Sequence, residues 1–285
     1  MKAILTTIII LAACGSNKPH EGNTELLAHL EKAQAERFDE ALTYVDENGW
    51  ITPTDCDGAL WSGKFGVFHD GFVFQAAQYM GEPGRFNRRP PPMCREGNED
   101  SRSTWSRDMG LSGLLQYAWL RGDLEILETH MAYVRGNGWF SGEPRSYDTT
   151  FYTPALRGLF YQVIYKLGGE DNNWRHTPNI YVSGLDDYRA HLQMVSIFLA
   201  GETWGFIDNN MLARIQEHAD REPRNAFYQV MRGRWLGDFE QAIYLCKYPD
   251  RDEASYVRCD EPRACYLAEA VWSCGLLLRY VSASM

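Results

Sequence analysis

Apolar residues recur at helical spacing along most of the chain. Residues 24–48 place apolar side chains on one side and charged ones elsewhere, which is typical of an amphipathic surface helix. Residues 57–80 and 104–120 are far more apolar, as expected of buried helices. Strand-like composition is confined to residues 179–183. The pattern therefore predicts an all-α fold.

Turn signals divide this pattern into helical pairs. Glycine followed by an acidic residue occurs at Gly122-Asp123, Gly201-Glu202 and Gly237-Asp238, where glycine can end one helix and the acidic residue can cap the next. Thr153-Pro154 predicts an N-cap followed by proline in the first turn. Further helices are predicted to begin at Asp187 and Pro262.

Two segments of the chain resemble each other. Residues 44–50, Tyr-Val-Asp-Glu-Asn-Gly-Trp, match residues 133–139, Tyr-Val-Arg-Gly-Asn-Gly-Trp, and a loop and a new apolar helix follow each of them. Repeated pairs of a buried and an amphipathic helix form an α/α toroid when they close around an axis, or an α-solenoid when they stack along one. The nearly all-apolar alternate helices favour closure. We therefore expect residues 24–285 to form a single all-α domain, an incomplete α/α toroid, with an α-solenoid as the alternative.

The N-terminus has the layout of a bacterial lipoprotein signal. Lys2 precedes an apolar run that ends in Leu-Ala-Ala-Cys-Gly at Cys14, and the run is too short to span a membrane. By resemblance to bacterial lipoproteins, residues 1–13 would be removed, Cys14 would carry the lipid, and residues 14–23 would form a flexible tether. Ser16 is not the aspartate associated with inner-membrane retention, so we expect outer-membrane anchoring on the periplasmic or surface side. The alternative is an ordinary cleaved signal with an incidental Cys14.

Composition restricts the partners. The net charge is −10, and the sequence contains no run of Lys or Arg that could neutralise nucleic-acid phosphates. The chain has 9 Trp and 16 Tyr, and such rings can stack against sugars, although ordinary packing accounts for most of them. We expect a carbohydrate or glycan partner and a membrane contact through the lipid, and no nucleic acid.

The cysteine count suits an oxidising compartment. There are seven cysteines, and six remain when Cys14 is set aside, which allows up to three disulfides. Free buried thiols are the alternative. Zinc is disfavoured because no pair has Cys-x-x-Cys spacing and no histidine lies beside the cysteines in sequence. The expected local bridge is Cys246–Cys259, across a loop rich in Pro and Asp.

The succession of helices resembles the six-hairpin α/α-toroid glycosidases and related lyases. The segment Trp105-Ser106-Arg107-Asp108-Met109 and the Gly-Asp hairpin turn that follows it are similar to patterns in that group, and the layout of residues 24–282 is comparable. The chain is short for six full hairpins. The resemblance implies a carbohydrate-active fold but assigns no catalytic residue to this sequence.

The site candidates follow from helix geometry, because the N-termini of the inner helices of a toroid meet at one face. The candidate catalytic carboxylates are Asp108, which lies beside an apolar helix and is the better acid, and Asp57 or Asp55, either of which could serve as base or nucleophile. The candidate substrate-binding residues are Arg107, Trp105, His191, Arg89 and Trp139. The alternatives are that the aspartates cap helices, that Arg107 pairs with Asp57, and that His191 is a core histidine bonded to backbone.

These observations predict a lipid-anchored envelope protein with a carbohydrate-active cleft, for which glycoside hydrolase and polysaccharide lyase are the candidate activities. The alternative is a sugar-binding or scaffolding lipoprotein without catalysis. Residues 54–58 resemble the start of a calcium loop, but Phe65, Gly66 and Val67 stand where its later ligands belong. We therefore expect no metal and no cofactor.

Overall fold

The structure of the protein is a computed structural model. It describes residues 21–47, 49–52, 58–72, 82–87, 105–142, 150–170, 187–248, 252–253 and 262–284. Within these ranges the regular secondary structure is helical, and the β contacts are two isolated bridges, Val45–Ile51 and Phe140–Phe151. The predicted all-α class is confirmed. The strand-like residues 179–183, Cys14, Asp55, Asp57 and Arg89 lie outside the described residues.

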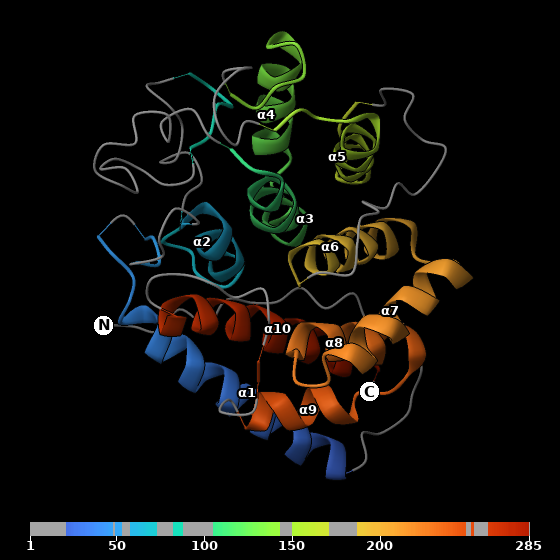
Figure 1. The fold of residues 1–285 in the computed structure, drawn as a ribbon. Helices are drawn as coiled ribbons and strands as arrows, with labels where there is room; N and C mark the ends of the chain where they lie inside the picture. The colour runs from blue at the N-terminus through green and yellow to red at the C-terminus, as the bar shows by residue number, and fades with distance from the viewer. Residues whose placement is uncertain are drawn as a thin grey trace.

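The described helices follow one another closely along the chain (Figure 1). One of them, η4, is a π-helix that continues directly into α3. The bounds are α1 Glu21–Leu42, α2 Gly58–Gly66, η4 Met109–Leu115, α3 Gln116–Arg121, α4 Leu124–Gly136, α5 Pro154–Lys166, α6 Asp187–Trp204, α7 Asn209–Arg221, α8 Ala226–Leu236, α9 Glu240–Lys247 and α10 Pro262–Ser284.

Most of the predicted helix boundaries are confirmed by their capping contacts. Gly122 ends α3 in the left-handed conformation, with φ 71°, and the Asp123 side chain accepts a hydrogen bond from the Ile126 N–H at 3.2 Å. Thr153 caps α5 in the same way, accepting from the Leu156 N–H at 3.4 Å. Gly237 ends α8 with φ 81°.

Three predicted boundaries are wrong. The helix predicted over residues 24–48 ends at Leu42. The helix predicted over residues 57–80 ends at Gly66. The turn predicted at Gly201 is absent, because α6 continues through it to Trp204 and Asp208 caps α7 instead. Gly201 has a packing role: a Cβ there would collide with the Trp235 indole of α8. A close contact between two helices requires a residue without a side chain, and a tight turn often requires one too. Glycine therefore occurs in both settings.

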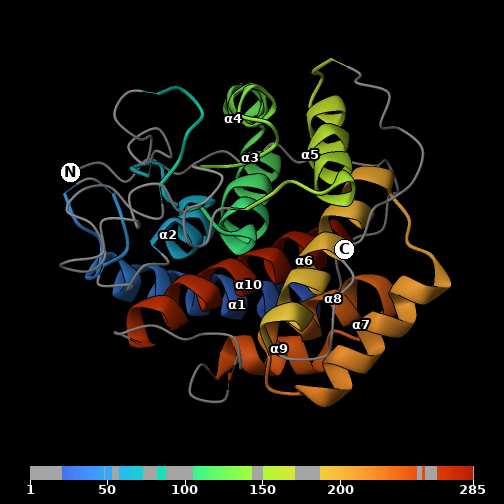
Figure 2. The ribbon, with the colours of Figure 1, turned by 45° about the horizontal axis from the view of Figure 1, so that its top comes forward.

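Five helical segments pack against one another in a circuit. Along it, α10 contacts α2, α2 contacts η4, η4 contacts α6, α6 contacts α8, and α8 contacts α10. Figures 1 and 2 show these helices in the middle of the molecule, with α1, α9, α7, α4 and α5 outside them.

The helices of the circuit run in the same direction. In α8 and α10, Phe227 lies against Trp272, and further along both helices Arg234 lies over the Tyr280 ring. Gly113 of η4 approaches Ala59 of α2, and Arg121 at the end of α3 donates to the Val67 carbonyl just past the end of α2 at 3.4 Å. In α6 and α8, the earlier pair His191 and Phe227 and the later pair Gly201 and Trp235 lie together.

The helix α1 runs in the opposite sense on the outside of α10. Gln34 donates to the Val271 carbonyl at 3.3 Å, and Glu40, further along α1, accepts from Arg263 at 2.7 and 2.6 Å, earlier in α10. The disulfide Cys246–Cys274 joins α9 to α10 with a Cα separation of 5.7 Å, a normal distance for such a bridge. The predicted Cys246–Cys259 pairing is therefore wrong, because helix packing brings Cys246 to a cysteine more distant in sequence.

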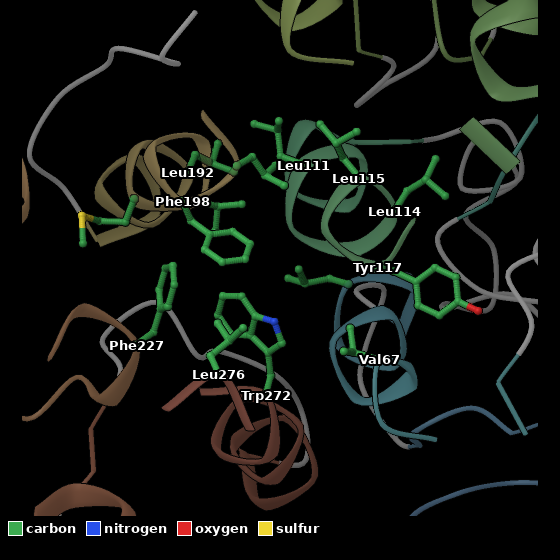
Figure 3. Close-up of a cluster of buried hydrophobic side chains, with 14 of the residues drawn as sticks. Val67, Leu111, Leu114, Leu115, Tyr117, Leu192, Phe198, Phe227, Trp272 and Leu276 are labelled. Atoms are coloured by element: carbon green, nitrogen blue, oxygen red, sulfur yellow. The ribbon is translucent and has the colours of Figure 1, made fainter. Parts of the chain in front are cut away.

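The middle of the circuit is filled with apolar side chains (Figure 3). Phe198 of α6, Phe227 of α8 and Trp272 of α10 point toward one another there, and the ring centroids of Phe227 and Trp272 lie 4.4 Å apart. All three side chains are fully buried. Because the centre is packed with rings, a polar group inside the circuit must find a partner in the protein.

Candidate functional site

Four ionisable side chains lie near one another inside the circuit, each from a different helical segment. They are Lys64 of α2, Asp108 immediately before η4, His191 in the second turn of α6 and Glu269 of α10, and we call them the axial cluster. All four residues are buried. Buried charge gathered from distant parts of the sequence indicates a candidate functional site, although structural ion pairs also have this character.

Lys64 and Glu269 form an ion pair with side-chain exposures of 0% and 2%. Ser273, one turn further along α10, donates to the second Glu269 oxygen at 3.2 Å. The Lys64 ammonium also lies 4.5 Å from the centre of the Trp272 ring and 5.4 Å from that of Trp61, within reach of cation–π attraction. These contacts offset part of the cost of removing both charges from water.

His191 lies next to this pair, with its Nε2 3.5 Å from Lys64 Nζ. Burial, together with the nearby Lys64 charge, holds the pKa of His191 well below its usual value. The imidazole is therefore neutral at physiological pH. Burial also lowers the pKa of Lys64, while Glu269 and, more weakly, Asp108 act to raise it. Asp108 is thus close enough to influence the ammonium charge.

Asp108 is 6% exposed and has helical backbone angles, φ −65° and ψ −41°, with no side-chain capping bond. In the part of the chain that the structure describes, its carboxylate accepts a hydrogen bond from the Ser106 hydroxyl. Its neighbour Arg107 is exposed. A nearly buried carboxylate can accept several hydrogen bonds, so a single hydroxyl donor leaves much of its capacity unused.

The other aromatic candidates lie in two environments. Trp105 is completely buried against Phe86 and His130, with ring centroids 5.5 and 6.0 Å away, so the core encloses its ring. Trp139 is half-buried, and the guanidinium of Arg157 covers its ring at 3.9 Å. The Trp105 carbonyl accepts hydrogen bonds from the Ser141 hydroxyl and from the Thr150 N–H, which places the Trp139 loop beside the beginning of η4.

Lys64 and Glu269 are not among the site residues predicted from the sequence. Each is the single charged residue within an apolar helical run, Leu60–Val67 for Lys64 and Ala264–Leu278 for Glu269. An isolated charge on an all-apolar helix was therefore the signal that could have identified them. Within the described residues, no group of three or more potential metal ligands comes together.

A second buried histidine, His130 of α4, has neutral partners. Its Nδ1 lies 2.7 Å from the Gly84 carbonyl oxygen, and its Nε2 lies 2.7 Å from the Tyr152 hydroxyl. The carbonyl can only accept, so Nδ1 carries the proton and Nε2 accepts from tyrosine. Burial lowers the pKa of His130 to about 4.

Comparison with known proteins identifies no relative. No protein-family model, curated protein or solved structure matches the chain. In the described ranges, no helix combines the length and the apolar character needed to cross a bilayer. The function must therefore be argued from the site itself.

Proposed function

We propose that the protein is an incomplete α/α toroid whose inner layer is the circuit of α2, η4 with α3, α6, α8 and α10. The shared direction of these helices and the opposite direction of α1 support this arrangement. Because inner helices that run in the same direction begin at the same end, their N-terminal ends form one face. Asp108 belongs to that end of the molecule.

We further propose that this face acts on a carbohydrate, with Asp108 as the acid that protonates the glycosidic oxygen. A second carboxylate would activate water or attack the sugar, and Asp57 and Asp55 remain the candidates for that role. The chemistry requires a separation of about 5–10 Å between the two carboxyl groups, depending on whether the configuration is retained or inverted. In a lyase, the same face would serve base-catalysed elimination.

The observation that carries this proposal is that the Asp108 carboxylate is buried with few hydrogen-bond donors among the described residues. It caps no helix, and its donor among the described residues is the Ser106 hydroxyl. Burial of a carboxylate with so little compensation costs free energy, and function is a common reason for such a cost.

A non-catalytic sugar-binding lipoprotein is the second candidate. The observation in its favour is that the Glu269 carboxylate is held by Lys64 and Ser273, so it is not free to act as the partner of Asp108. On this alternative, the axial cluster would only maintain the shape of the binding face.

The test is hydrolysis or elimination by the purified full chain on a panel of neutral and acidic polysaccharides, measured as new reducing ends and as absorbance of unsaturated products. Asp108→Asn keeps the shape of the side chain but removes the acidic group, and it should lower the rate of glycan cleavage by at least about 100-fold. The control, Asp220→Asn, changes an exposed carboxylate of α7 and should have the wild-type rate. Full activity in Asp108→Asn would reject the catalytic role, and binding without turnover by the wild type would favour the second candidate.

We also propose that lipid on Cys14 anchors the protein to the outer membrane, on its periplasmic or surface side. The basis is the residue pattern around Cys14. Cells fed labelled palmitate should incorporate label into the wild-type protein and not into Cys14→Ala. An unlabelled wild-type protein would contradict the lipoprotein assignment.

A further inference from the structure

A cationic aromatic surface lies at the first turn of α5, where Arg157 contacts the rings of Trp139 and Phe151. It consists of Trp139, Phe151 and Arg157, which we call the Trp139 platform. The Arg157 guanidinium lies 3.9 Å from the centre of the Trp139 ring and 5.4 Å from that of Phe151. Phe151 is 44% exposed, although most large apolar side chains of the protein are buried. An arginine held beside an exposed ring combines a charged donor with a stacking surface.

Among the described residues, the Arg157 guanidinium has a hydrogen-bond partner for its Nε–H and none for its two terminal nitrogens. Its Nε–H donates to the Tyr152 carbonyl at 2.5 Å. In the described part of the chain, no carboxylate pairs with its two terminal nitrogens. A guanidinium fixed flat against a ring presents those nitrogens in one plane, which is the geometry that binds a carboxylate through two parallel hydrogen bonds.

Arg234 provides an internal reference for this arrangement. It also stacks on aromatic rings, with distances of 4.9 Å to Trp235 and 5.0 Å to Tyr280. Arg234 differs in having a carboxylate, because Glu202 lies 3.6 Å from its Nε. Among the described residues, Arg234 therefore has a carboxylate partner and Arg157 has none.

The backbone of Trp139 has an unusual conformation. Trp139 has φ 71°, and it is the one non-glycine residue with positive φ in the described ranges. The matching segment places Trp50 in the core, 1% exposed, with its ring edge-on to Phe72. The left-handed conformation costs free energy for a tryptophan, and here it accompanies a half-buried ring that supports Arg157.

Two arginines of the described residues lie near the platform. The net charge of the protein is −10, yet Arg135 of α4 and Arg157 both lie within electrostatic reach of the Tyr161 hydroxyl. Two arginines near one surface favour the approach of an anion to that place.

We propose that the Trp139 platform binds a uronic acid residue of an anionic glycan, with the sugar face stacked on Phe151 and the carboxylate held by the two terminal nitrogens of Arg157. A uronate matches both parts, because one side of its ring presents C–H groups and its carboxylate projects from the ring edge. This deepens the proposed function by naming the substrate class and rests on it for the choice of a sugar. The Ser141 hydroxyl and the Thr150 N–H, next to the platform in sequence, both donate to the carbonyl of Trp105, which precedes Asp108 by three residues.

The experiment measures binding by calorimetry with the full chain. The ligands are oligosaccharides of galacturonate and of glucuronate, each compared with its neutral counterpart of equal length. We expect the wild type to bind a uronate oligosaccharide at least about tenfold more tightly than its neutral counterpart, with affinity falling as salt rises. Equal binding of the acidic and neutral ligands, or no binding of either uronate, would overturn the proposal.

Two variants and a matched control complete the test. Arg157→Gln should abolish the preference for the acidic ligand. Phe151→Ala removes the exposed ring, leaves the guanidinium in place, and should weaken both acidic and neutral ligands. Arg234→Gln, which removes a stacked arginine that has a carboxylate nearby, should bind as the wild type does. Wild-type preference in Arg157→Gln, or its loss in Arg234→Gln, would contradict the assignment.

The outcome is separable from the test of Asp108. Binding is measured without turnover, so an inactive protein that prefers uronates would support the platform and reject catalysis. Hydrolysis of neutral glycans that depends on Asp108, without any preference for uronates, would support the proposed function and reject the platform.

Discussion

His191 and His130 are both buried, yet the first lies beside an ion pair and the second among neutral groups. Near His191, the Lys64 ammonium and the Glu269 carboxylate remain charged because each is the partner of the other. Near His130, the Gly84 carbonyl and the Tyr152 hydroxyl satisfy both ring nitrogens without any charge. In both places burial keeps the imidazole neutral, but only the axial cluster contains charges that depend on one another.

The two regions also connect different parts of the chain. The His130 contacts join α4 to two nearby loop segments, at Gly84 and Tyr152. The Lys64–Glu269 pair joins residues 205 positions apart and lies where α2 meets α10. The charged contact therefore joins α2 and α10, which are the first and last helices of the circuit in chain order and lie next to each other. Loss of one charge should affect the whole domain, whereas loss of a neutral hydrogen bond should have a smaller effect.

The largest predicted effect comes from breaking the ion pair. Glu269→Ala leaves the Lys64 ammonium buried without its partner and should lower the free energy of unfolding by about 3–5 kcal/mol. The double variant Lys64→Met with Glu269→Met removes both charges at similar volume and should recover most of that loss. Urea unfolding of the two variants measures the difference. A double variant as unstable as Glu269→Ala would show that packing, and not the unpaired charge, dominates.

The second prediction concerns pH and the neutral region. The folded pKa of His130 is about 4 and its unfolded value is near 6.5, so between these values the unfolded chain binds the proton and the folded protein does not. The contribution of His130 is therefore complete above pH 6.5 and decreases by about 3 kcal/mol as the pH falls to 4. Glutamine does not bind this proton, so His130→Gln should lose about 3 kcal/mol less stability than the wild type between pH 6.5 and pH 4. Stability curves that remain parallel between pH 6.5 and 4 would contradict the assignment.

The comparison with His130→Gln is needed because other groups titrate in the same range. Burial raises the pKa of Asp252 to about 7, so the folded protein binds this proton and the unfolded chain releases it above its lower pKa. The contribution of Asp252 thus falls as pH rises toward 7, opposite in sign to that of His130. Subtracting the variant curve from the wild-type curve isolates the histidine.

The smallest predicted effect comes from Tyr152→Phe. This change removes the hydroxyl that donates to His130 and leaves Nε2 buried without that donor, at a cost of about 1–3 kcal/mol. Chemical unfolding at pH 7 measures the loss, and Tyr165→Phe, at an exposed tyrosine of α5, serves as the control. A loss as large as that of Glu269→Ala would remove the distinction between the charged and neutral regions.

Local signals predicted the helices well where they act through neighbouring residues. The Asp123 and Thr153 caps and the Gly122 and Gly237 ends depend on contacts within one turn, so their residue types are sufficient. The turn predicted at Gly201 is wrong because this glycine allows close packing against Trp235, which is distant in sequence. The π-helical turn at η4 was not predicted, and its segment was expected to be an ordinary helix.

The candidate site was predicted in part. Asp108 and His191 are predicted from the sequence, and each lies near the Lys64 ammonium. The aspartates Asp55 and Asp57 stay predictions, since they lie outside the described residues. Trp105 was selected for its ring, which the core encloses. Neighbours in sequence could not reveal which aromatic residues face outward.

The sequence by itself determined the all-α class, the amphipathic outer helices and most helix ends, because hydrophobic periodicity and capping act over a few residues. Only the tertiary structure decided that Lys64 would pair with Glu269 and that Cys246 would pair with Cys274. It also decided that, in matching segments, Trp50 would be buried and Trp139 only half-buried. These outcomes depend on which helices pack together. Such packing follows from the shape and burial of the whole core, to which residues far apart in the chain contribute at once.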